Sequence, residues 1–179
     1  IATDGWSMGV MWREVRAAYE AACSGEELVL NELPYQALDY NLWREEQLAA
    51  HDGRLRSMQL DHWKKMLDTA PPVLDIMPDH PRPAVQTYGG AGVPFTIPKE
   101  LVERLEGIAA NEGGTLFMVL LGSFQLLLSR YSRSKDVVVC TPFAGRTHAD
   151  ATGLIGCLFN TLAIRATIDE SMSFSDLIR

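Results

Sequence analysis

The stretch Leu158–Ile168, with the sequence LFNTLAIRATI, decides the fold class because it has the side-chain pattern of a β-strand. Successive side chains of a strand point to opposite faces, so the even-numbered residues of this stretch share one face. That face holds one polar residue, Asn160, among the apolar residues Leu158, Leu162, Ile164, Ala166 and Ile168. A β-branched run at Val137–Cys140 predicts a second strand that is covered on both faces and ends at Pro142.

Helical segments surround these strands. Ser7 is a candidate N-cap for a helix that ends near Gly25, which can adopt the left-handed C-terminal conformation. Apolar residues at helical spacing, with their flanking break signals, predict further helices over about 36–50 and 54–67, from Pro98 to Gly113, and after Thr115. Because helix and strand signals interleave, the sequence predicts an α/β (α+β) sandwich rather than a helix bundle.

The composition excludes several classes of protein. The chain has 179 residues, of which 47% are hydrophobic, so it can fill a sizeable core and is not a disordered linker. Its formal net charge is -7, and no cluster of Lys and Arg is evident, which argues against nucleic-acid and membrane-surface partners. The longest apolar stretch, Leu116–Leu128, is shorter than the roughly 20 residues of a bilayer span.

The reactive side chains form no recognisable catalytic or metal-binding motif. Cys23, Cys140 and Cys157 lie among apolar neighbours and are predicted to be buried free thiols in a reducing compartment. The four histidines lack metal-ligand spacing, so no metal site is expected. No phosphate loop, dinucleotide fingerprint or GxSxG motif is present in the sequence.

Asn160 is the polar residue that most needs an explanation. A buried amide that lacks a partner costs roughly 1–3 kcal/mol, so this side chain is expected to form hydrogen bonds. Two interpretations stay open on the residues alone. Asn160 either ties its strand to a neighbouring loop or lines a ligand channel.

Six segments, taken in order along the chain, resemble the motifs of nonribosomal peptide synthetase condensation domains. The first, Ile1–Ser7 (IATDGWS), is similar to the end of the active-site motif HHxxxDG and begins just after its two histidines. The remaining segments are similar to the QYxDYAxW stretch, the PTDRPRP connector, the next two blocks and the IGxFVNTL block. They lie at Leu33–Trp43, Pro78–Pro83, Thr115–Leu121, Thr141–Arg146 and Ile155–Leu162.

The resemblance implies a chloramphenicol-acetyltransferase-like fold whose two lobes meet at a tunnel. Residues 1–70 would be the end of the N-terminal lobe, 71–84 a Pro-rich connector and 85–179 the start of the C-terminal lobe, so the fold would be incomplete in this chain. The implied reaction is the formation of a peptide (amide) bond between an acyl or peptidyl donor and an aminoacyl acceptor. Both substrates arrive as thioesters on the 4'-phosphopantetheine arms of carrier proteins, and no cofactor is expected to bind the chain directly.

The implied partners are the donor and acceptor peptidyl carrier proteins, an adjacent adenylation domain and the remainder of the condensation domain, all in the cytoplasm. Asp4 would be the motif carboxylate, which holds its loop through an ion pair with an arginine expected upstream of this chain. Gly5 would let the backbone approach the substrate closely. The resemblance further assigns four residues to the substrate channel: Trp6, Ser7, Asn160 and Thr161.

The sequence also departs from the family pattern. Both motif histidines are absent, so the chain alone is expected to be inactive, and its uncovered apolar surface is expected to promote self-association. One alternative is a non-catalytic condensation-like module that docks carrier or partner proteins. Another is an epimerising domain or a coenzyme-A-dependent acyltransferase of the same fold.

Overall fold

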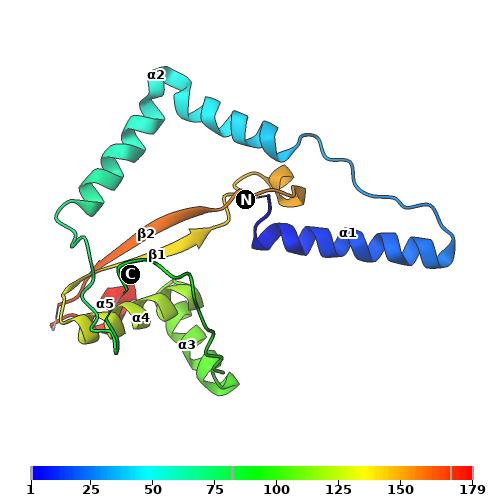
Figure 1. Cartoon of the computed structure of the whole chain (residues 1–179). Helices are drawn as coiled ribbons and strands as arrows, with labels where there is room; N and C mark the ends of the chain where they lie inside the picture. Colours follow the sequence, from blue (N-terminus) through cyan, green and yellow to red (C-terminus); the bar gives the residue numbers. More distant parts are fainter. Residues whose placement is uncertain (1, 82, 170, 179) are drawn as a thin grey trace. The chain divides into compact units, whose positions relative to one another are not determined.

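The computed structural model describes residues 2–81, 83–169 and 171–178. Ile1 and Arg82, which belong to two of the motif segments, lie outside the described residues. The elements follow one another as α1 (Gly5–Ser24), α2 (Ala37–Leu67), α3 (Lys99–Asn111), α4 (Leu116–Ser132), β1 (Asp136–Phe143), the 3-10 helix η1 (Ala149–Gly153), β2 (Asn160–Thr167) and α5 (Phe174–Ile178) (Figure 1).

The chain divides into two compact units. One comprises Ile1–Asp68 with Cys140–Ala163, and the other comprises Thr69–Val139 with Ile164–Arg179. The segment Cys140–Ala163 therefore groups with the N-terminal third of the chain, although it follows the Pro-rich segment in sequence. The described residues of that segment, 71–84, contain no helix, as predicted, and no strand. The assignment of lobe boundaries within a whole condensation fold stays a prediction.

The first unit holds α1, α2 and η1. Asp4, rather than the predicted Ser7, caps α1 by accepting a hydrogen bond from the Ser7 backbone N–H at 2.8 Å. Gly25 ends the helix with φ 71°, which confirms the predicted left-handed residue. The predicted break between the next two helices is also confirmed, because Ala50–Gly53 have non-helical backbone angles inside α2.

A small core holds η1 and the residues around it to the start of α2. Leu33, Tyr35 and Ala37 pack against the buried cluster of Tyr40, Ala151, Leu154 and Leu158. The Tyr40 hydroxyl donates to the Gly145 carbonyl at 3.0 Å and accepts from the Thr147 N–H at 3.2 Å. The loop after β1 is therefore fixed to α2 by both apolar and polar contacts.

The second unit holds α3, α4 and α5. Thr115 caps α4 through its side chain, which accepts from the Met118 N–H at 3.3 Å, as the sequence predicted. Gln125 is buried on α4, and its Nε2 donates to the Ile164 carbonyl at 3.0 Å. The core of this unit is the buried cluster of Ala109, Val119 and Ile178, with Leu105 and Phe174 packed against it.

Strands β1 and β2 pair as a two-stranded antiparallel sheet (Figure 1). The predicted burial of β1 on both faces is wrong, because Val137 is buried whereas Cys140 and Phe143 are exposed. The strand also continues through Pro142, which is tolerated because a strand in a two-stranded sheet has a free edge.

The prediction of buried thiols is wrong as well. Cys23, Cys140 and Cys157 are all exposed, and they form no disulfide with one another. Apolar neighbours in sequence do not bury a side chain unless another element covers that face.

Taken singly, no helix in the described ranges has the length and apolar character to cross a membrane, although α3 and α4 pass that test together as a pair bent by 100°.

Candidate functional site

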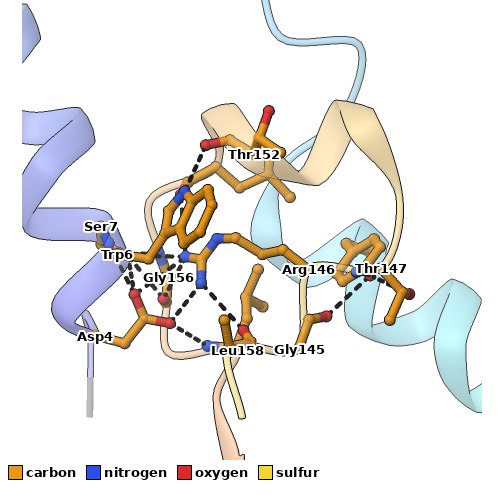
Figure 2. Close-up of polar contacts among 12 residues, drawn as sticks. Asp4, Trp6, Ser7, Gly145, Arg146, Thr147, Thr152, Gly156 and Leu158 are labelled. Atoms are coloured by element: carbon orange, nitrogen blue, oxygen red, sulfur yellow. Dashed lines mark hydrogen bonds and ion pairs between the residues drawn. The ribbon is translucent and has the colours of Figure 1, made fainter. Parts of the chain in front are cut away.

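A buried ion pair between Asp4 and Arg146 is the centre of the candidate site (Figure 2). The Asp4 side chain is 4% exposed and the Arg146 side chain 1%. Arg146 Nη1 donates to Asp4 Oδ2 at 2.7 Å and Nη2 donates to Oδ1 at 3.1 Å, so the contact is bidentate. This finding corrects the expectation that the arginine partner of Asp4 lies upstream, because the partner follows Asp4 by 142 positions in the same chain.

Three further donors saturate the Asp4 carboxylate. The backbone N–H of Ser7 donates to Oδ1 and that of Leu158 donates to Oδ2, at 2.8 and 3.1 Å. The Ser7 hydroxyl lies 2.7 Å from Oδ1 and is fully buried. Because Ser7 lies in α1 and Leu158 lies just before β2, Asp4 joins the start of α1 to the segment that precedes β2. Hydrogen bonds to a charged carboxylate are stronger than neutral ones, so this link is a strong one.

Ser7 makes a second link between these segments. Its Oγ accepts from the Gly156 backbone N–H at 3.0 Å and lies 2.9 Å from the Gly156 carbonyl. Arg146 Nη2 also donates to Ser7 Oγ at 3.1 Å. Because this hydroxyl has several buried partners, Ser7 contributes to the scaffold of the motif, which differs from the channel position expected for it.

Two glycines allow the loop to approach closely. A Cβ at Gly145, where φ is 72°, would lie 2.0 Å from the Leu158 carbonyl oxygen. A Cβ at Gly156 would lie 2.6 Å from the Ala37 Cβ. Any larger residue would therefore displace backbone at the first position, and this close packing sets the position of Arg146.

Arg146 and its neighbours control the ionisation of Asp4. Burial by itself would raise the pKa of the Asp4 carboxyl, but the hydrogen bonds from Arg146, Ser7 and Leu158 outweigh burial and hold that pKa well below its usual range. The carboxylate stays ionised, and its two oxygens already accept several hydrogen bonds. Asp4 is therefore suited to positioning the loop and poorly suited to proton transfer.

An open, mostly apolar pocket lies beside this ion pair. It has a volume of about 410 Å³, and its lining residues are Asp4, Gly5, Trp6, Pro142, Ala144 and Phe159. Trp6 donates from Nε1 to the Thr152 carbonyl at 2.9 Å, and its ring lies 5.7 Å from the Arg146 guanidinium carbon (Figure 2). The indole thus shields one side of the ion pair while forming a wall of the pocket.

Gly5 lies at the edge of the same pocket. Outside its own helix and its chain neighbours, no described atom would lie within 4 Å of a Cβ at Gly5. The space beside its Cα is therefore open in the described structure. Close approach of a substrate to Gly5 stays a prediction.

Asn160 and Thr161 lie at the start of β2, directly after Phe159, and both are exposed. The expected burial of Asn160 is wrong. Its Oδ1 accepts from the Thr161 N–H at 2.8 Å, so the oxygen is used locally. Burial does not alternate along β2, because residues 162–166 are half-buried on both faces and the face that was predicted to be buried is uncovered at Asn160.

Arg146 is the residue of the site that the sequence reasoning missed. It ends a motif segment, Thr141–Arg146, and follows Gly145, whose positive φ marks a tight turn. A lone cation directly after a glycine, at the end of a motif segment, was the available signal. Within the described ranges, no group of three or more His, Cys, Asp or Glu side chains could hold a metal ion.

Comparisons with known proteins agree with the motif pattern. A family model described as the condensation domain matches residues 1–179. A linear gramicidin synthase protein of Brevibacillus parabrevis is 43% identical over 178 residues, which cover 99% of this chain and 2% of that protein. The chain therefore spans a small fraction of this relative.

Solved structures agree with the predicted fold class. The first condensation domain of the CDA synthetase superimposes with a TM-score of 0.74 at 23% identity, over 99% of this chain and 38% of that chain. Holo-AB3403, a four-domain nonribosomal peptide synthetase bound to AMP and glycine, superimposes with a TM-score of 0.78 at 29% identity, over 98% of this chain and 13% of that chain. These likenesses confirm the chloramphenicol-acetyltransferase-like fold, of which the chain spans a part.

Proposed function

This chain belongs to the condensation-domain family of nonribosomal peptide synthetases, and from this premise we propose that it is part of a domain that forms amide bonds between carrier-bound substrates. In this reaction the amine nitrogen of an aminoacyl acceptor attacks the thioester carbonyl carbon of an acyl or peptidyl donor. A C–N bond forms, the C–S bond breaks, and the amine loses a proton as the donor carrier regains its thiol. A thioester is already activated, so the catalyst needs chiefly to position the two substrates.

The observation that best supports this function is the buried Asp4–Arg146 pair beside the apolar pocket. The pair fixes Gly5 and Trp6 at the rim of a space of about 410 Å³, next to Phe159. An apolar wall suits an acyl or aminoacyl group, and the ion pair keeps that wall in place without taking part in proton transfer. Asp4 is therefore proposed as a positioning residue, and Gly5 and Trp6 as residues that adjoin the substrate.

Asn160 and Thr161 are proposed to contact substrate at the start of β2. The Asn160 side-chain Nδ2 forms no hydrogen bond with any residue that the structure describes, whereas its Oδ1 is engaged by Thr161. The amide thus has donors available for a carbonyl group of a substrate. Substrates are proposed to arrive on 4'-phosphopantetheine arms of donor and acceptor carriers, in a cytoplasmic assembly that includes an adenylation domain.

The test is a single-turnover reaction with the longer protein that contains this chain, a loaded donor carrier and a loaded acceptor carrier. Intact-protein mass spectrometry should show that the acceptor carrier gains the mass of the donor acyl group. Carrier binding with no mass transfer would instead identify a docking module. A changed donor configuration with no mass transfer would identify an epimerising domain, and transfer from an acyl-coenzyme A would identify an acyltransferase.

An Asn160→Ala variant tests the proposed substrate contact. Losing one hydrogen bond of about 0.5–1.5 kcal/mol corresponds to a roughly two- to tenfold slower transfer. Asn41→Ala is the matched control, because Asn41 is an exposed asparagine on α2 and outside the pocket beside Asp4. An unchanged rate in Asn160→Ala, with the control also unchanged, would remove Asn160 from the site.

A further inference from the structure

A basic pocket lies at the end of α4, within the second unit. Its volume is about 220 Å³, and its lining residues are Ser129, Arg130, Arg133, Ser134, Lys135 and Ile168. Three cations thus surround one hollow in a chain whose formal net charge is -7. This local group contradicts the expectation that the sequence holds no Lys and Arg cluster.

The three cations, Arg130, Arg133 and Lys135, form no ion pair within the described part of the chain, residues 2–81, 83–169 and 171–178. Serine hydroxyls satisfy the nearby carbonyls instead. Ser132 Oγ donates to Leu128 O at 2.8 Å, and Ser129 Oγ donates to Ser134 O at 2.6 Å. The basic side chains are therefore available to an external anion.

The position of Arg133 also requires an explanation. A cation near a helix C-terminus is favoured by the helix dipole, which accounts for Arg130 in the last turn of α4. Arg133 follows the helix as its C-cap with φ 55°, a left-handed conformation that favours glycine. Glycine would adopt this backbone conformation at a lower cost, so the conformation itself gives no reason for an arginine at this position.

We infer that this pocket binds the phosphate group of a phosphate monoester. Two arginines and a lysine supply charge and several N–H donors, and the described residues that line the pocket include no carboxylate. Guanidinium groups match phosphate oxygens in a bidentate manner, and a dianion gains most from three surrounding cations. This inference does not depend on the proposed amide-bond chemistry, because the residues that carry it belong to the second unit.

The inference is tested by titrating the 179-residue chain with methyl phosphate at constant ionic strength and following backbone amide shifts by NMR. We expect saturable shifts at Ser134 and Lys135. Dimethyl phosphate, a monoanionic diester, should bind more weakly. Equal binding of the diester would leave a phosphate site in place but overturn its assignment to a monoester.

Arg133→Gly separates binding from folding. Glycine relieves the left-handed backbone, so the midpoint of urea unfolding should rise while methyl phosphate affinity falls roughly two- to fivefold. Arg104→Gln on α3 is the control, because it removes an exposed cation that does not line this pocket. Shifts that fail to saturate, or an equal loss of affinity in Arg104→Gln, would overturn the inference.

Discussion

Replacing Arg146 by methionine should show whether the buried ion pair holds the motif in place. Methionine keeps most of the side-chain length but leaves the Asp4 carboxylate, 4% exposed, without its counter-charge. Asp4 would retain the N–H groups of Ser7 and Leu158 and lose both guanidinium bonds. Removing one partner of a buried pair costs about 3–5 kcal/mol, a large share of the roughly 5–15 kcal/mol that stabilises a typical domain.

The measurement is urea unfolding combined with hydrogen exchange at the Ser7 and Leu158 amides, which report local opening around Asp4. Arg16→Met is the matched control, because the Arg16–Glu20 pair is 80% and 61% exposed and should contribute little. In the double variant Asp4→Asn with Arg146→Met, no buried charge remains, so its loss of stability should be smaller than the sum of the two single losses. Additive losses, or a cost below about 1 kcal/mol for Arg146→Met, would refute the reasoning.

Acid provides a second readout of the same variant. The pKa of Asp4 is lowered in the folded chain, so its stabilising contribution is present above the unfolded value of about 3.9 and is lost as the pH falls toward the folded value. In Arg146→Met the buried carboxylate lacks its partner, and protonation relieves that penalty. The stability difference between wild type and Arg146→Met should therefore shrink as the pH falls below about 4.

Two further changes test how the loop around Arg146 is built. Gly145→Ala should abolish the native packing of this loop, because the added Cβ would lie 2.0 Å from the Leu158 carbonyl oxygen. Gly25 also has a positive φ, 71°, but beyond its chain neighbours no described atom would lie within 4 Å of an added Cβ, so Gly25→Ala should cost only about 1 kcal/mol in urea unfolding. Ser7→Ala should cost about 1–3 kcal/mol because the buried Gly156 N–H loses its acceptor, and normal protection of that amide from hydrogen exchange would contradict this role.

Most features that depend on neighbouring residues were predictable from the sequence, although the N-cap of α1 was predicted at Ser7 and lies at Asp4. The end of α1 at Gly25, the break at Ala50–Gly53 and the cap at Thr115 each rest on residues a few positions apart, and the structure confirms them. Asn160 was mispredicted because alternation shows which face a residue occupies and does not show whether another element covers that face. Arg146 was missed because its contact with Asp4 joins residues 142 positions apart.

That long-range contact changes how the motif should be understood. If Asp4 relied on a partner elsewhere, the segment before β2 would be a passive neighbour of the motif. Instead, Arg146 and the Leu158 N–H both reach the Asp4 carboxylate, and Gly156 engages the hydroxyl of Ser7. The loop between the strands therefore belongs to the same structural element as the Asp-Gly pair. Since the low pKa of Asp4 keeps it ionised and its oxygens are occupied, this element can hold a reacting group in position, while any proton transfer must fall to a different side chain.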